Sequence, residues 1–104
     1  MSLQKMLREI LYQRIVEAFD EFVSKHLPYS NWYVGITEDI NDCLFNGHQL
    51  DEYDLHDCDN AGNDVTARAV EKYFLDKGMK SAGGGEKKSS KFVYIYLQAK
   101  HTKP

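Results

Sequence analysis

Several features that would assign this chain to a broad class are missing from its sequence. No apolar run approaches the roughly 20 residues that a membrane span needs, so we expect no membrane partner. Residues 1–9 have no signal-peptide core, and we expect a cytoplasmic protein whose two cysteines, Cys43 and Cys58, stay reduced. The formal net charge of -3 excludes a global electrostatic attraction to nucleic acid or to anionic membranes.

The length and composition are those of one small folded domain. The chain has 104 residues, of which 42% are hydrophobic and 12% are aromatic, which is enough for a single modest core. No segment repeats along the chain, and the tract of Gly, Ser and Lys at residues 80–91 predicts a loop. We therefore expect residues 1–104 to form a single α+β domain.

Two segments have the apolar spacing of helices. Apolar side chains recur in steps of three and four over residues 3–27, which predicts one long helix with a single apolar face. A second helix is predicted from Val65 to about Lys77, with Asn63 or Asp64 as its N-cap. The main apolar stripe of the first helix is Leu3, Leu7, Leu11, Ile15, Phe19 and Phe22 or Val23, widened by Met6, Ile10 and Val16.

Two runs of β-branched and aromatic residues predict strands. The first covers residues 32–36, after which Thr37 is expected to cap a short helix over residues 39–46. The second, residues 92–97, is apolar or aromatic on both faces, which predicts a central or well-covered strand. Because two strands alone make no stable sheet, a third is expected within residues 49–57. The predicted fold class is α+β, with a small antiparallel sheet of about three strands covered by helices.

The strand that begins Tyr33-Val34-Gly35 resembles the second half of the signature of the GIY-YIG nucleases. The segment after it resembles the helix that carries the family's arginine. Residues 67–75 resemble the later helix of that family, whose glutamate holds a divalent metal. The resemblance therefore implies a GIY-YIG-like core over residues 31–100, with Glu71 as the ligand of Mg²⁺ or Mn²⁺.

The chain departs from the family's pattern in three places. The first half-motif is absent upstream of Tyr33, where the long helix lies, but residues 92–97 have the right character. A permuted arrangement would pair the two strands and put Tyr94 in the place of the missing tyrosine. The arginine position, eight residues after the glycine, holds Cys43, and the histidine of the pattern is displaced by one residue, to His48.

The resemblance implies a catalytic site of Tyr33, Tyr94 and His48, with one tyrosine as the base and Glu71 holding the metal. An arginine normally neutralises the charge that develops on the phosphate, and losing one such contact commonly costs a factor of about 10² to 10³. Its replacement would have to be Arg68 or a lysine of the basic loop. The candidate phosphate-binding lysines are Lys80, Lys87 and Lys88. We therefore expect weak or absent nuclease activity.

Other interpretations of the sequence remain open. Cys43, His48, His56 and Cys58 form a series of zinc-ligand types, Cys-x4-His-x7-His-x-Cys, which would make this a small zinc-binding domain. The spacing is not that of common zinc modules, so we do not expect zinc. One remaining class is a protein directed at nucleic acid, with a GIY-YIG-like fold. The other is an interaction module whose N-terminal helix docks a protein partner or a second copy of the chain. The acidic balance and the missing arginine favour the second class, whereas the Tyr-Val-Gly strand, the placement of Glu71 and the basic loop favour the first.

Overall fold

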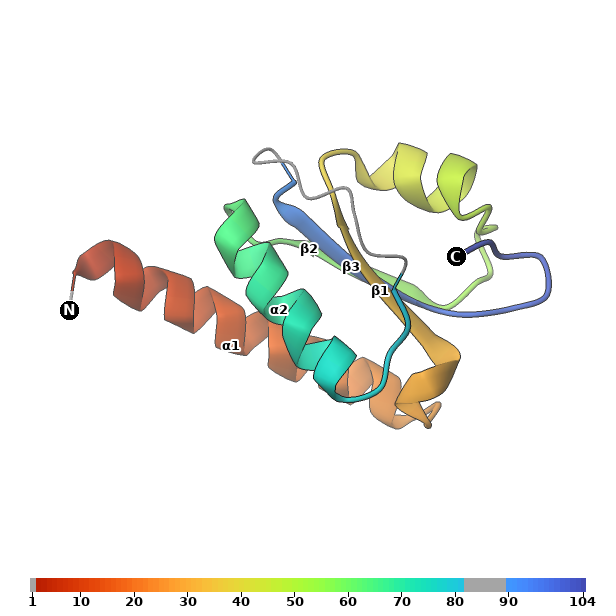
Figure 1. Ribbon diagram of the computed structural model, residues 1–104, viewed down its shortest axis with the longest axis horizontal. Coiled ribbons are helices and arrows are strands. Elements are labelled where there is room, and N and C mark those ends of the chain that lie inside the picture. The colour runs from red at the N-terminus through yellow and green to blue at the C-terminus, as the bar shows by residue number, and fades with distance from the viewer. Residues whose placement is uncertain (1, 82–89) are drawn as a thin grey trace.

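The computed structural model of this protein describes residues 2–81 and 90–104. It has the predicted α+β fold, with a long N-terminal helix and a small antiparallel sheet (Figure 1). In chain order the elements are α1 (Leu3–Ser24), η1 (Tyr29–Asn31), β1 (Trp32–Thr37), η2 (Asp42–Gly47), β2 (His56–Asn60), α2 (Asp64–Asp76) and β3 (Phe92–Leu97). Within the described part of the chain, no helix has the length and apolar character needed to span a membrane.

The sheet has the strand order β1-β3-β2, and both neighbouring pairs are antiparallel. Residues 92–97 form the central strand, and they pair with residues 32–37, as the permuted arrangement implied. The third strand, His56–Asn60, begins near the end of the segment where it was expected. Its Asp-rich sequence has low strand propensity, so its place in the sheet depends on pairing with β3 and not on its own residues.

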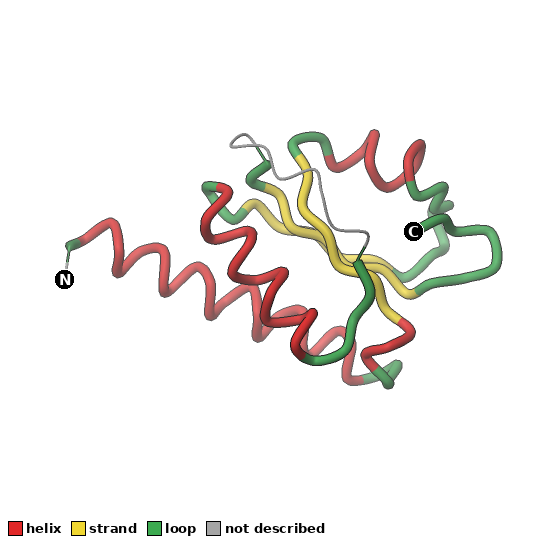
Figure 2. The backbone as a smooth tube through the Cα atoms, in the orientation of Figure 1, coloured by secondary structure: helices red, strands yellow, loops and turns green. Residues whose placement is uncertain are grey.

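Both helices pack on one face of the sheet (Figures 1 and 2). Strand residues alternate between faces, and the side chains of Val34, Val93 and Ile95 point toward the helices. Burying each large apolar side chain contributes roughly 1.5–3 kcal/mol, so this face supplies most of the core. Its helical members are Ile15, Val16, Phe19 and Val23 of α1 and Ala67, Val70 and Phe74 of α2.

Only part of the apolar stripe of α1 faces this core. Phe19 is 1% exposed, whereas Leu3 is 69% exposed and Leu7 is 56% exposed. Four residues advance about 40° beyond one helical turn, so a stripe in steps of four drifts by about 160° between Leu3 and Phe19. The prediction of a single apolar face is therefore wrong for the first third of α1, which projects beyond the sheet in Figure 1.

One carboxylate ties α1 to the rest of the molecule. The Asp20 carboxylate accepts hydrogen bonds of 2.7 Å from the hydroxyls of Tyr29, in η1, and Tyr73, in α2. These hydrogen bonds raise the pKa of Tyr29 and of Tyr73 to about 12, because the neutral phenol is the better partner of a carboxylate. The C-terminal half of α1 is thus held by polar as well as apolar contacts.

The segment after β1 differs from the predicted helix. It forms a π-helical turn, η2, and Thr37 does not cap it: the Thr37 hydroxyl accepts the N–H of Asp39 at 3.1 Å. The Asp39 carboxylate in turn accepts the N–H of Asp42 at 3.1 Å. The wider π turn closes with a hydrogen bond of 2.8 Å from the His48 N–H to the Cys43 carbonyl. That bond fixes the backbone at His48.

Candidate functional site

The face of the sheet opposite α1 and α2 carries a group of aromatic side chains. Tyr33 of β1 lies beside Tyr96 of β3, with ring centroids 5.1 Å apart. The ring of His48 lies 4.7 Å from that of Tyr33 and 5.4 Å from that of Tyr94. We call Tyr33, His48, Tyr94 and Tyr96 the tyrosine–histidine cluster. The resemblance predicted three of its members, Tyr33, Tyr94 and His48, and the structure brings them together.

The backbone after η2 turns the His48 side chain toward the sheet. Gln49 has a φ of 58°, in the left-handed region, which reverses the chain direction within one residue. The next residue, Leu50, donates its N–H to the Leu44 carbonyl at 3.0 Å. Leu44 and Leu50 are both buried against the tyrosines. They anchor the turn from both sides, so the position of His48 is fixed by packing.

The hydrogen bonds of the cluster determine the tautomer of His48. Its Nδ1 lies 2.6 Å from the Lys103 carbonyl, which only accepts, so Nδ1 carries the proton. The His48 Nε2 therefore accepts the hydroxyl of Tyr94, at 2.6 Å. The Tyr96 hydroxyl donates to the same Lys103 carbonyl at 3.1 Å, and the Lys103 N–H donates to the His48 carbonyl at 2.7 Å. Both ring nitrogens of His48 are thus satisfied inside the protein.

Burial keeps the cluster neutral. It lowers the pKa of His48, with the hydrogen bond to the Lys103 carbonyl acting weakly in the opposite direction. Burial, and next the neighbouring Cys43 side chain, raises the pKa of Tyr94 far above its ordinary value. Tyr33 and Tyr94 are only 4% and 3% exposed. At neutral pH the Tyr94 hydroxyl stays protonated, which does not suit a base that must take a proton from water.

Gly35 has a packing role in this cluster. It lies opposite Tyr94 in the strand register, and a Cβ added to it would come within about 2.5 Å of the Tyr94 ring carbon Cζ. Only a glycine lets the phenol ring lie flat across β1. The closeness of the Tyr94 ring therefore explains why a glycine stands at this position. A role in substrate binding is not needed to explain it.

The other predicted catalytic residues lie on α2, which covers the opposite face of the sheet. Arg68 forms an ion pair with Asp64, one turn earlier, at 3.5 Å. The carboxylate of Glu71 lies 3.5 Å from the Ser81 hydroxyl. Neither residue belongs to the tyrosine–histidine cluster, because α2 packs its apolar side chains into the core on the other face of the sheet. The permuted arrangement required Glu71 and the tyrosines to share one cleft. In the structure these residues do not share one.

The predicted phosphate-binding lysines are placed only in part. Lys80 has an exposed side chain, and its backbone pairs with the outer edge of β1. Its N–H donates to the Trp32 carbonyl at 2.9 Å, and its carbonyl accepts the Val34 N–H at 2.9 Å. Lys87 and Lys88 lie outside the described residues. Lys80 thus lies at the edge of the sheet, where its main chain hydrogen-bonds to β1.

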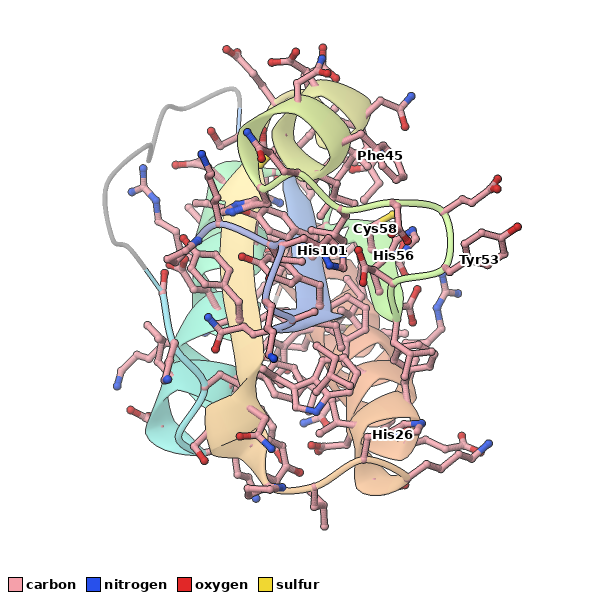
Figure 3. The ribbon with its side chains drawn as sticks, turned by 90° about the vertical axis from the view of Figure 1, so that its right-hand side faces the viewer. His26, Phe45, Tyr53, His56, Cys58 and His101 are labelled. Atoms are coloured by element: carbon pink, nitrogen blue, oxygen red, sulfur yellow. The ribbon has the colours of Figure 1, made fainter. Side chains whose placement is uncertain are left out.

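Cys43, His48, His56 and Cys58, whose residue types would suit zinc, do not form a cluster among the described residues. Among residues 2–81 and 90–104, the potential metal ligands that lie within 4.8 Å of one another are the side-chain donor atoms of Asp51, Asp54 and His101. His101 Nε2 lies 2.6 Å from the Asp54 carboxylate and 3.5 Å from that of Asp51. The bond to Asp54 raises the pKa of His101, which favours an ion pair. Figure 3 shows His56 and Cys58 on β2 and His101 in the C-terminal segment. Sequence reasoning missed this pairing, because no local pattern links residue 54 to residue 101.

Two open concave surfaces of the described chain flank the projecting part of α1. One groove, of about 540 Å³, runs along the helix itself and is lined by Met6, Glu9, Ile10, Gln13, Arg14 and Glu17. A second, of about 380 Å³, lies between α1 and the start of α2. It is lined by Lys5, Arg8, Glu9, Tyr12, Val65, Thr66 and Ala69. Both grooves border exposed apolar side chains.

No family model, no curated protein and no solved structure matches this chain. The GIY-YIG resemblance therefore stays a prediction.

Proposed function

We propose that this chain is a non-catalytic protein-interaction module, which docks a partner on the projecting part of α1. The observation that carries the proposal is the exposure of four large apolar side chains on consecutive turns of one helix. Leu3 is 69% exposed, Ile10 59%, Leu7 56% and Met6 46%. Single exposed apolar residues are ordinary, but a contiguous group beside a groove marks an interaction surface.

Helix energetics support the same proposal. The projecting residues form between two and three turns, and an isolated helix of that length is marginal in water. Their Ser2 cap, which accepts the Lys5 N–H at 3.2 Å, contributes about 1 kcal/mol. Docking would bury the apolar side chains and would also reduce fraying of the helix. A partner therefore gains a binding face that is already helical and aligned by the rest of α1.

We further propose that the scaffold is GIY-YIG-like but has lost the chemistry. The pairing of β1 with β3, which the permuted arrangement predicted, supports the relationship. The burial of Tyr33 and Tyr94, and the cysteine at the arginine position, favour a structural role for the cluster. The tyrosines and His48 then serve to hold the Lys103 segment against the sheet.

Substitution of Tyr94 tests the structural role. Tyr94→Phe removes the hydroxyl that His48 Nε2 accepts and leaves a buried nitrogen without its partner. We expect a loss of about 1–3 kcal/mol in the free energy of unfolding, measured by urea denaturation. We also expect no cleavage of labelled DNA or RNA in Mg²⁺ or Mn²⁺ by the unsubstituted protein. Metal-dependent cleavage that Tyr94→Phe abolishes would overturn the non-catalytic proposal.

A matched pair of variants tests the docking face. Ile10→Glu places a charge in the middle of the exposed apolar group, whereas Leu27→Glu makes a similar change after the end of α1. The two side chains are equally exposed, at 59% and 58%. In cross-linking from native cells, we expect Ile10→Glu to lose the partners that the unsubstituted protein and Leu27→Glu both capture. Partners that tolerate Ile10→Glu, at unchanged circular dichroism, would refute the proposal.

A further inference from the structure

We infer that residues 98–104 form a strap closed over the tyrosine–histidine cluster, and that a peptide offering the same main-chain groups as Lys103 displaces it. This binding site lies on the face of the sheet opposite α1 and is separate from the docking face proposed above. Three observations support it: how Lys103 is bound, what holds the strap, and what the strap covers.

His48 binds the main chain of Lys103 at two points. The Lys103 N–H donates to the His48 carbonyl at 2.7 Å, and the Lys103 carbonyl accepts from His48 Nδ1 at 2.6 Å. The Tyr96 hydroxyl donates to the same carbonyl at 3.1 Å. One residue of main chain thus meets both an acceptor and donors, as a peptide does when it binds beside the edge of a sheet.

The groups that His48 and Tyr96 bind are common to almost every peptide. The side chain of Lys103 is exposed, and the three hydrogen bonds use only its main-chain N–H and carbonyl. Every residue except proline has the same pair of groups. The site therefore recognises main chain, and the class of ligand that fits it is a peptide.

The strap itself is held by polar contacts. None of residues 98–104 belongs to the apolar cores that the described residues form. Its other attachments are the Gln98 N–H, which donates to the Asn31 carbonyl at 2.9 Å, and His101 Nε2, which lies 2.6 Å from the Asp54 carboxylate. Exposed polar contacts of this kind contribute little each, so the strap opens at a lower cost than the sheet unfolds.

The strap covers groups that are ready to bind a replacement. The segment after β3 loops back toward η2 (Figure 1), and beneath it Tyr96 is 0%, Tyr94 3% and His48 9% exposed. When Lys103 moves away, His48 Nδ1 and the Tyr96 hydroxyl both lose their acceptor. A peptide carbonyl satisfies both donors, and the N–H of the same peptide residue satisfies the His48 carbonyl.

The tether decides how well a free peptide competes. A segment joined to its site by a short linker has an effective concentration in the millimolar range, so the closed strap excludes a weak ligand. Loosening the strap raises the open fraction, and the apparent affinity for a free peptide rises by the same factor. Removal of the exposed His101 contact should therefore strengthen peptide binding by about threefold.

Amide hydrogen exchange of the full chain tests whether the strap opens by itself. We expect the protection factor of the Lys103 amide to be at least about tenfold below those of the β3 amides, and to be insensitive to low urea, because the opening exposes little surface. Equal protection of Lys103 and β3 would overturn the inference, since the strap would then open only when the sheet unfolds. An unprotected Lys103 would also overturn it, since the strap would not be closed in solution.

A nuclear magnetic resonance titration tests the displacement. The ligand is a free peptide with the sequence of residues 98–104, added up to about 5 mM to the unsubstituted protein, to His101→Ala and to the control Lys100→Ala, which changes a neighbouring exposed residue. We expect saturable shifts of the His48 and Tyr96 resonances, with an apparent Kd at least about threefold lower for His101→Ala than for the other two proteins. The free peptide keeps its own histidine for the contact with Asp54.

A modified peptide tests main-chain recognition. Methylation of the nitrogen at the position of Lys103 removes the N–H that the His48 carbonyl accepts, so this peptide should bind at least about threefold more weakly. Absence of shifts at His48 and Tyr96 in His101→Ala would overturn the inference. So would the same apparent Kd for all three proteins, or for the two peptides.

Discussion

The two ends of α1 contain the same kinds of apolar residue in the same spacing, yet they have different surroundings. Phe19 and Val23 are buried between the sheet and α2, whereas Leu3 and Leu7 are mostly in solvent. The covered end is also held by the hydrogen bonds of Asp20 to Tyr29 and Tyr73. Helical spacing therefore predicts that these residues lie on a helix. Which of them the fold buries depends on how far the apolar stripe rotates around the helix and on where the sheet ends.

The largest expected effect comes from the covered end of α1. Phe19→Ala removes a ring that is 1% exposed and lies 5.8 Å from the ring of Phe74. We expect a loss of about 3–5 kcal/mol in the free energy of unfolding, measured by urea denaturation at low micromolar concentration. A loss under about 1 kcal/mol would show that the two ends of α1 are alike, and that the sheet does not depend on this helix.

A smaller effect is expected from loss of the hydrogen bonds that Asp20 accepts. Asp20→Asn removes the charged acceptor of the Tyr29 and Tyr73 hydroxyls, and we expect a loss of about 1–3 kcal/mol near neutral pH. The two phenols have a raised pKa of about 12 in the folded protein and an ordinary value of 10 when unfolded. Their contribution is therefore full below pH 10 and is lost as the pH rises from 10 to 12.

Phenolate absorbance at alkaline pH checks this assignment. The chain has seven tyrosines, so the informative quantity is the difference between the two titration curves. In Asp20→Asn we expect two more tyrosines to ionise near pH 10 than in the unsubstituted protein. Identical titration curves would mean that Asp20 does not hold the two hydroxyls in solution.

The smallest effect on stability is expected from the projecting end. Leu7→Ala shortens a side chain that is 56% exposed, so we expect a change within about 0.5 kcal/mol in a dilute monomer. A loss of stability comparable to that of Phe19→Ala would break the comparison, since it would mean that Leu7 is covered.

Much of the fold follows from local sequence. Residues 92–97 have the strand character that β3 requires, and Asn63 caps α2 by accepting the Thr66 N–H at 2.8 Å. The helix of residues 3–27 was predicted slightly too long, because α1 ends at Ser24. Residues 56–60 were harder to assign, since their acidic sequence becomes a strand only through its neighbour.

The site was less predictable than the fold. The Tyr-Val-Gly pattern led to Tyr33, Tyr94 and His48, which do lie together. Nothing in the sequence indicates that the Lys103 carbonyl accepts from His48, because that contact joins residues far apart along the chain. Nor does the helical position of Glu71 show which face of the sheet α2 covers. Both depend on tertiary packing, which residue types alone do not express.

Amide hydrogen exchange along α1 tests the central claim most directly. At about 5 µM we expect residues 3–10 to exchange quickly and residues 15–23 slowly, because only the second group is covered by the fold. Equal protection of residues 3–10 and residues 15–23 would contradict the account, because the projecting end would then be covered by the fold.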